Sequence, residues 1–260
     1  MRTPCAPPGM IEGVPDRPDA NRRADLAQRL TAVRARIDAA CEGAGRPAGS
    51  VALVAVTKTV PALDVATLLD LGLTAFGENR VQEAGAKVDE VAALRPDAVP
   101  RWHVVGGLQR NKARAVVRWA EQVESVDSAR LADALGSAVR RARDAGERDR
   151  PLSVLVQYSV DGDPARGGVP RTDLLRLAEH VAGCAGLQLA GLMAVAPLGA
   201  DPDIAFADVA AAAELLRAAQ PGASTLSAGM SGDLEAAIRH GSDVVRVGTA
   251  LVGERRLTSP

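Results

Sequence analysis

The chain has 260 residues, of which 47% are hydrophobic and 24% are charged, and its formal net charge is -1 at neutral pH. This composition is typical of a globular protein with a sizeable core, and the balanced charge and scarce aromatic side chains exclude a surface built for nucleic acid. The three cysteines, Cys5, Cys41 and Cys184, are odd in number and far apart, so we expect free thiols and no metal site.

Residues 1–19 are rich in proline and glycine and lack the apolar stretch of a secretory signal. We expect a flexible tail, with Met10 as an alternative start because nothing before it belongs to the expected fold. The uncharged stretch 181–200 contains four glycines and a proline, which break it into a turn, a strand and a loop rather than a membrane span. The sequence therefore predicts a cytoplasmic protein without a membrane partner.

An amphipathic helix is expected after the tail, because apolar residues recur at three- and four-residue steps from Leu26 to Ile37, and Gly43 and Gly45 follow. Beyond it, short runs with strand character alternate with segments rich in alanine and leucine. The runs expected as strands are residues 51–57, 73–76, 102–105, 122–126, 153–160, 189–195, 224–227 and 243–247. The segments expected as helices are residues 62–71, 81–94, 112–120, 128–145, 173–182, 204–219 and 233–240.

The alternation of eight strands with helices indicates an α/β fold with a parallel sheet. In a chain of this length we expect a single (β/α)8 TIM-type barrel over residues 20–256, with an extra N-terminal helix, in preference to an open doubly wound sheet. The glycines within residues 43–49 follow a helix, so they do not form a dinucleotide-binding fingerprint, and the chain has no Walker A sequence.

Lys58 ends the apolar run of the first expected strand, so its amine is expected at the carboxyl end of the barrel, where active sites of this fold lie. Of 31 basic residues only Lys58, Lys87 and Lys112 are lysine. A partly desolvated amine can form a Schiff base with a carbonyl, which a guanidinium does not do. Lys58 is therefore either a covalent nucleophile or an exposed strand-end charge. Lys87 and Lys112 are interpreted as surface or helix-terminal charges.

A second group of residues lies at the ends of the seventh and eighth expected strands, where this fold usually binds phosphate. Ser227 and Ser231 offer hydroxyls in a glycine-containing loop before a helix, although Ser231 could simply cap that helix. Gly248 would let the backbone approach an anion closely, and Thr249 adds a hydroxyl. Arg246 in the last strand either belongs to the same site or makes a structural salt bridge.

Two further segments, residues 76–83 and 102–112, each follow or contain a strand and then enter a helix. Asn79 and Gln109 are placed to cap those helices. His103 lies within a strand pattern, where a histidine is more often a hydrogen-bonded core residue than a catalyst. These residues by themselves indicate no mechanism.

Lys58 and five motifs in a fixed order give the chain a specific resemblance to the pyridoxal phosphate homeostasis protein family. The motifs are F-G-E-N (76–79), W-H-x-x-G-x-L-Q-x-N-K (102–112), G-L-M (191–193), L-S-x-G-M-S (226–231) and V-R-V-G-T (245–249). The resemblance extends from about Asp25 to Arg255. Proteins of this family are related in fold to the N-terminal barrel of alanine racemase and are regarded as carriers or regulators of pyridoxal 5'-phosphate (PLP) without established catalysis.

The resemblance implies that PLP is held as an internal aldimine on Lys58, with no catalytic residue. Arg246 would face the pyridine nitrogen and keep it unprotonated, which weakens the ring as an electron sink. The resemblance also implies PLP-dependent apoenzymes as recipients, and we expect a monomer. Further residues that it places around the cofactor are Ser227, Ser231, Gly248 and Thr249 for the phosphate, Gly229 and Met230 in the nearby loop, and Asn79, His103 and Met193 lining the pocket.

Three positions depart from the family pattern without touching the expected cofactor contacts. Gly107 stands where proline is common, Ala228 replaces a frequent methionine, and Arg166 occupies a loop position often held by lysine. The last change puts in doubt any role for a second lysine in that loop.

Two other functions stay open beside intracellular PLP homeostasis. A PLP-dependent amino-acid racemase needs a base on each face of the substrate. Alanine racemase takes its second base from a C-terminal domain that we expect this chain to lack, and the only tyrosine, Tyr158, lies in the fifth expected strand. An aldolase-type barrel would use a lysine to bind a phosphorylated sugar directly. We expect a non-catalytic PLP protein, and its visible absorption would distinguish it from an aldolase.

Overall fold

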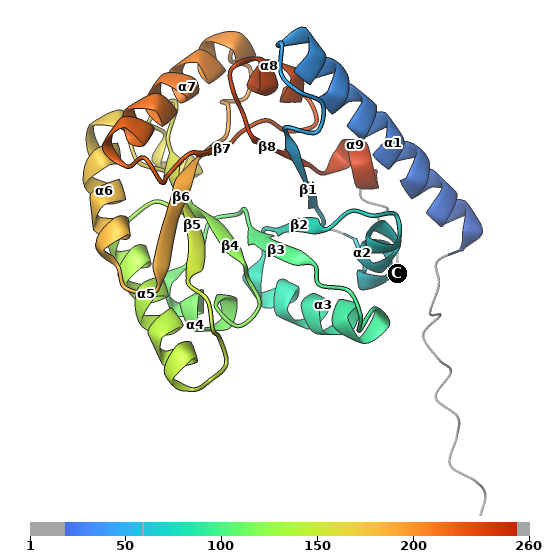
Figure 1. Ribbon diagram of the computed structural model, residues 1–260, viewed down its shortest axis with the longest axis horizontal. Coiled ribbons are helices and arrows are strands. Elements are labelled where there is room, and N and C mark those ends of the chain that lie inside the picture. Colours follow the sequence, from blue (N-terminus) through green and yellow to red (C-terminus); the bar gives the residue numbers. More distant parts are fainter. Residues whose placement is uncertain (1–18, 59, 254–260) are drawn as a thin grey trace, which may run out of the picture.

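The computed structural model describes residues 19–58 and 60–253, which form a closed barrel of eight parallel strands with helices around it (Figure 1). Each strand pairs with the next, and β8 pairs with β1, where Val54 lies opposite Arg246. The expected barrel is confirmed, and its closure excludes an open sheet. The strands are β1 (Ala52–Val56), β2 (Ala75–Glu78), β3 (Arg101–Val104), β4 (Gln122–Val126), β5 (Leu152–Tyr158), β6 (Leu187–Ala194), β7 (Thr225–Ser227) and β8 (Val244–Val247).

The described helices cover the outside of the barrel and connect successive strands (Figure 1). They are α1 (Ala20–Gly43), α2 (Ala62–Asp70), α3 (Val81–Leu94), α4 (Ala113–Val116), α5 (Ala129–Asp144), α6 (Arg171–Gly183), α7 (Pro202–Ala219), α8 (Leu234–Arg239) and α9 (Thr249–Val252), with short 3-10 helices η1 (Arg110–Lys112) and η2 (Pro164–Arg166). Most predicted boundaries agree within two residues.

The predicted helix over residues 112–120 is wrong in extent, since the structure has only η1 and the four-residue α4 there. β4 begins at Gln122, so the chain has to turn back directly after α4. The amides of Trp119 and Ala120 both donate to the carbonyl of Val116, at 3.1 and 2.9 Å, which closes that turn. The requirement to start the next strand therefore ends the helix early.

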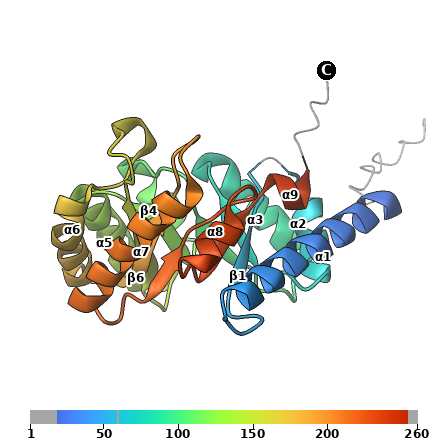
Figure 2. The same cartoon turned by 90° about the horizontal axis from the view of Figure 1, so that it is seen from above.

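The extra N-terminal helix, α1, packs along the outside of the barrel beside α8 and α9 (Figure 2). Its buried stripe, from Leu26 to Cys41, belongs to the hydrophobic cluster that also contains Leu234 and Leu251. Asp19 begins the helix by accepting a hydrogen bond from the amide of Asn21 at 2.8 Å. The rest of the expected tail, residues 1–18, and the end of the expected barrel domain, residues 254–256, lie outside the described residues.

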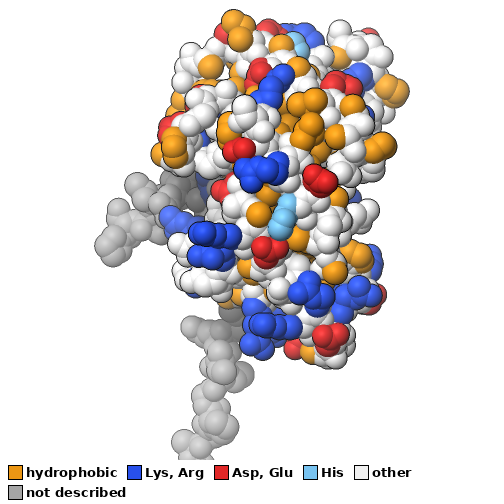
Figure 3. Space-filling view, turned by 90° about the vertical axis from the view of Figure 1, so that its left-hand side faces the viewer, with side chains coloured by type: hydrophobic (Ala, Val, Ile, Leu, Met, Phe, Trp, Pro, Cys, Tyr) orange, Lys and Arg blue, Asp and Glu red, His pale blue; other side chains and the backbone are white. Residues whose placement is uncertain are grey.

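The core has two hydrophobic clusters between strands and helices, one beneath α4 to α7 and one beneath α1 to α3, α8 and α9. On the side of the barrel that faces the viewer in Figure 3, charged side chains of both signs are interspersed with hydrophobic ones. Within residues 19–58 and 60–253, no helix is long and apolar enough to cross a membrane.

Candidate functional site

Lys58 lies two residues beyond β1 and is exposed at the carboxyl end of the barrel, directly after the fully buried Thr57. It lines two cavities at once, one of about 710 Å³ and one of about 610 Å³. The larger cavity is bounded mainly by the loops after β6, β7 and β8. The predicted site residues in its wall are Lys58, Met230, Ser231, Arg246, Gly248 and Thr249.

The loop after β7 is held in shape by backbone contacts. Gly229 has a φ of +93°, and a Cβ atom there would lie 2.6 Å from the Cβ of Ala237, so this position requires glycine. The carbonyl of Gly229 accepts from the amide of Arg246 at 2.9 Å. The loop is therefore fixed against β8, and Gly229 supports the cavity wall from beneath without lining it.

The hydroxyl of Ser231 connects this loop to the next one, because it accepts a hydrogen bond from the amide of Ala250 in α9 at 3.3 Å. The alternative role as a helix cap is wrong, since α8 begins after Asp233 without a side-chain cap bond. Asp233 instead accepts from the amide of Met230 at 2.5 Å. Ser231 thus lies between the loops that follow β7 and β8.

Gly248 differs from Gly229 in its φ angle and in the space around an added Cβ atom. Its φ is -106°, and an added Cβ atom would lie 3.5 Å from Val56, which is ordinary van der Waals contact. Packing within the described protein therefore does not require glycine here. A backbone without a side chain at this position leaves room in the cavity wall beside Thr249.

Arg246 is buried and anchored in the barrel interior. Its Nη1 donates to the hydroxyl of Ser227 at 2.6 Å and its Nη2 donates to the carbonyl of Ala194 at 2.8 Å. Burial lowers the pKa of Arg246, and the negative charges of Glu124 and Asp233 oppose that change. The guanidinium is thereby fixed at the inner end of the cavity.

A buried hydrogen-bonded chain continues from Arg246 across the barrel. Ser227 donates to Glu124 Oε2 at 2.6 Å, and His103 Nδ1 lies 2.7 Å from Glu124 Oε1. Burial alone would raise the pKa of Glu124, but the hydrogen bond and charge of His103 and the charge of Arg246 outweigh it, so the pKa is lowered. Because an ionised carboxylate only accepts hydrogen bonds, His103 Nδ1 and the Ser227 hydroxyl are both donors here.

The second cavity contains an unsatisfied polar atom. Asn79 lines it together with Lys58, and the side-chain oxygen of Asn79 is buried without a hydrogen-bond partner in the described part of the chain. The predicted cap role is wrong, because Arg80 rather than Asn79 occupies the N-cap position of α3. Gln109 occupies the N-cap position of η1 but makes no cap bond with its side chain.

Lys87 is not the surface charge that its helical pattern predicts. Its side chain is 12% exposed, and its Nζ donates to Glu78 Oε1 at 2.8 Å and to the carbonyl of Thr57 at 2.7 Å. The Thr57 hydroxyl also donates to Glu78 Oε1, at 2.7 Å. Lys87 therefore neutralises a buried carboxylate directly beneath the segment that carries Lys58.

The remaining predicted site residues, Met193, Ser227 and His103, are buried within the barrel and do not line either cavity. Sequence reasoning missed Glu124 and the partnership of Lys87 with Glu78. A charged residue in the middle of an expected barrel strand was the available signal for Glu124. No comparable signal pointed to Lys87, because α3 is amphipathic by its sequence and its charged residues are expected on the exposed face.

Comparisons with known proteins agree with the observed fold. The family model for alanine racemase, N-terminal domain, matches residues 29–256. The chain is 47% identical over 249 residues to the pyridoxal phosphate homeostasis protein of Mycobacterium tuberculosis, covering 92% of this chain and 96% of that one. An unknown protein from Bifidobacterium adolescentis has a TM-score of 0.82 at 32% identity, covering 90% and 96% of the two chains. PipY of Synechococcus elongatus, solved with PLP bound, has a TM-score of 0.73 at 34% identity, covering 88% and 100%.

Proposed function

The chain belongs to the pyridoxal phosphate homeostasis protein family, and from this premise we propose that it binds PLP at the carboxyl end of the barrel and serves intracellular PLP homeostasis. One observation carries the proposal: Lys58 shares a cavity with Ser231, Gly248 and Thr249. PLP has an aldehyde and a phosphate ester on neighbouring positions of its ring, so its site needs an amine and an anion-binding wall that face one space.

The residues present fit this cofactor. The cavity of about 710 Å³ is within the size range of small-molecule sites. Gly248 leaves space that the protein does not need for its own packing. A phosphate held by backbone amides would need such space, because a side chain there would keep it at a distance. Asn79 lines the second cavity together with Lys58, and its buried oxygen, which has no partner among the described residues, is suited to accept a hydrogen bond from a bound molecule.

We assign the covalent attachment to Lys58, whose Nζ condenses with the aldehyde carbon of PLP and releases one water. Ser231, Gly248 and Thr249 hold the phosphate, with Gly229 and Met230 shaping the adjoining loop. A phosphate contact by Ser227 stays a prediction, because its hydroxyl already donates to Glu124. Met193 and His103 contribute to the site from within the barrel interior.

Arg246 determines the character of the site. When bound, PLP supplies an electron sink, and a carboxylate near the pyridine nitrogen strengthens it by favouring protonation. Arg246 cannot accept a proton and is held in place by Ser227 and the carbonyl of Ala194. Next to the pyridine nitrogen, this guanidinium would leave it unprotonated. The arrangement suits a non-catalytic carrier, which we propose acts in the cytoplasm as a monomer.

A racemase is the alternative, and the state of Tyr158 argues against it. Racemisation requires a second base, and the Tyr158 hydroxyl is committed as a donor to Asp208 Oδ2 at 2.6 Å. Burial, followed by the hydrogen bond to Asp208, raises the pKa of Tyr158, so its phenolate is disfavoured. Incubation with single enantiomers of amino acids is expected to give no racemisation; turnover would favour the alternative.

The direct test of the proposal is the visible absorption spectrum with added PLP, recorded for the wild type, Lys58→Ala and Lys112→Ala. We expect a yellow wild type, whose adduct maps to Lys58 after borohydride reduction. Lys112 lines neither cavity, so Lys112→Ala is the matched control and should behave as the wild type. A colourless and unlabelled wild type would contradict PLP binding and favour an aldolase-type imine with a phosphorylated sugar.

Carrier function requires release as well as binding. Mixing the PLP-loaded protein with a PLP-dependent apoenzyme is expected to restore the activity of that enzyme while the yellow colour of the carrier declines. Retention of all PLP by the loaded protein would argue against a role in supply. Light scattering during size-exclusion chromatography tests whether the chain is a monomer.

A further inference from the structure

Three side chains with metal-binding atoms meet on the outer surface between α5 and α6. Asp133 comes from α5, His180 from the last turn of α6, and Cys184 from the residue that follows α6. Asp133 Oδ1 lies 2.8 Å from His180 Nε2 and 3.8 Å from Cys184 Sγ, and all three ligand atoms lie within 4.8 Å of one another. The cluster is separate from both cavities that Lys58 lines.

We propose that Asp133, His180 and Cys184 form a binding site for Zn²⁺ or a chemically similar divalent transition metal, with water as the fourth ligand. A thiolate, an imidazole and a carboxylate together are the donor set of zinc sites. Mg²⁺ and Ca²⁺ prefer oxygen ligands throughout and would not use two of the three atoms. This assignment replaces the expectation from sequence that no metal site is present.

The geometry needs little change to hold the metal. Zinc bonds of about 2.0–2.3 Å in a tetrahedron place neighbouring ligand atoms about 3.3–3.8 Å apart. The separation of 3.8 Å between Cys184 Sγ and Asp133 Oδ1 is already close to this. His180 and Asp133 are exposed at the surface, where their side chains can adjust, and the spacing of four residues puts His180 and Cys184 on neighbouring turns.

A metal would replace two hydrogen bonds that now converge on one oxygen of Asp133. Cys184 Sγ donates the longer of these two bonds, at 3.8 Å, so its thiol carries a proton in the absence of a metal. Coordination exchanges that proton for the cation: the S–H bond breaks, the metal–sulfur bond forms, and one proton leaves to solvent.

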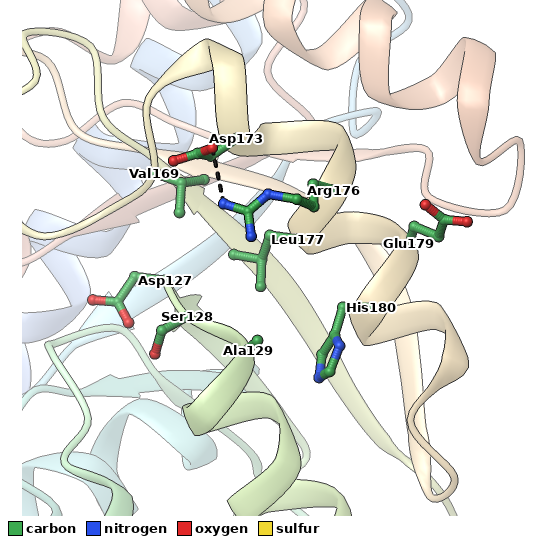
Figure 4. Close-up of a pocket in the computed structure, with 9 residues that line it drawn as sticks. All are labelled: Asp127, Ser128, Ala129, Val169, Asp173, Arg176, Leu177, Glu179 and His180. Carbon is green, nitrogen blue, oxygen red and sulfur yellow. Dashed lines mark hydrogen bonds and ion pairs between the residues drawn. The ribbon is translucent and has the colours of Figure 1, made fainter.

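Of the three proposed ligands, His180 also lines a surface cavity of about 510 Å³ between α5 and α6 (Figure 4). The wall of this cavity includes Asp127, Asp173 and Glu179, against the single cation Arg176. Arg176 is paired with Asp173 at 2.9 Å, as the dashed line in Figure 4 marks. The excess of carboxylates favours the approach of a cation.

The test is a Co²⁺ titration of the full-length protein, saturated with PLP and with its cysteine thiols reduced. Binding is followed by visible difference spectroscopy. We expect one Co²⁺ per chain, with a thiolate-to-metal band and the intense visible bands of four-coordinate cobalt, and their displacement by Zn²⁺. Loss of an outer-shell partner already weakens metal binding by about tenfold or more. Cys184→Ala and Asp133→Asn should weaken it at least as much, and Cys184→Ala should abolish the thiolate band.

His240→Ala is the matched control, because His240 makes a similar contact with Asp203, at 2.9 Å, elsewhere on the surface and without a cysteine. This variant should bind Co²⁺ like the wild type. Absence of the thiolate band, unchanged binding by Cys184→Ala, or an equal loss in His240→Ala would each overturn the assignment.

Discussion

Polar groups on the rim of the proposed cofactor site differ from those beneath it in whether the protein provides them with partners. On the rim, Lys58 has no hydrogen-bond or ion-pair partner among the described residues, and Gly248 leaves space that packing does not require. Beneath the rim, Lys87 lines the second cavity but is paired with the buried Glu78, and in the barrel interior Glu124 accepts from both His103 and Ser227. We infer from this difference that the paired groups stabilise the barrel, whereas the groups on the rim are available to bind a ligand.

Lys87→Met gives the largest expected effect, because it leaves the carboxylate of Glu78, with a side chain that is 2% exposed, without its cation. Breaking a buried ion pair in this way costs about 3–5 kcal/mol of unfolding free energy. Urea denaturation measures the loss, and Lys112→Met on η1 is the control. The double variant Lys87→Met/Glu78→Gln should recover part of the stability. Borohydride reduction of the fraction of Lys87→Met that stays folded should still trap PLP on Lys58. If Lys58 were no longer labelled in that fraction, Lys87 would contribute to PLP binding as well as to stability.

Glu124→Gln tests the interior chain through its pH dependence. Because the pKa of Glu124 in the folded protein is below its ordinary value of 4.5, its stabilisation is complete at neutral pH and is lost as the pH falls below that value towards the folded pKa. Removing the charge should cost about 1.5–3 kcal/mol at neutral pH.

The measurement is urea denaturation of the wild type and Glu124→Gln from neutral pH down to about 3, below the unfolded pKa of the carboxyl group. Their unfolding free energies should converge as the pH falls. A difference that stays constant over this range would show that Glu124 does not stabilise the fold through its charge.

Gly229→Ala and Gly248→Ala form a matched pair that separates stability from PLP binding within the loops of the rim. Gly229→Ala should destabilise the fold by about 1–3 kcal/mol, because of its positive φ and the contact with Ala237. Gly248→Ala should change stability by less than about 0.5 kcal/mol yet weaken PLP binding, since the new methyl group occupies space assigned to the phosphate. Thermal unfolding and PLP titration separate the two effects. Equal PLP affinity for Gly248→Ala and the wild type would contradict the phosphate assignment.

The barrel could be predicted from sequence because each strand and most helices carry their own local periodicity. Lys58, Ser231, Gly248 and Thr249 could also be placed, since all follow strands that end at one face of the barrel. Partnerships between distant segments could not be predicted. His103 meets Glu124 only because β3 pairs with β4 so that His103 lies opposite Gln122, and one-dimensional periodicity does not give that register.

The same limit explains the surface cluster. Asp133 and His180 are 47 residues apart, and only the packing of α5 against α6 brings them together. Cys184 by itself gave no indication of a ligand set. What the sequence lacks in these cases is the contact between two elements, not the chemistry of the residues.

The seam between β1 and β8 has a consequence for how the protein is made. Ribosomes deliver α1 and β1 first, yet α1 packs on α8 and α9, and β1 needs β8 as a neighbour. During synthesis, the apolar stripe of α1 can pack on α2 but stays only partly covered until α8 and α9 emerge, which favours protection by chaperones. Gly248 and Thr249 arrive with those same elements, so the nascent chain would gain the complete proposed cofactor site only when the barrel closes.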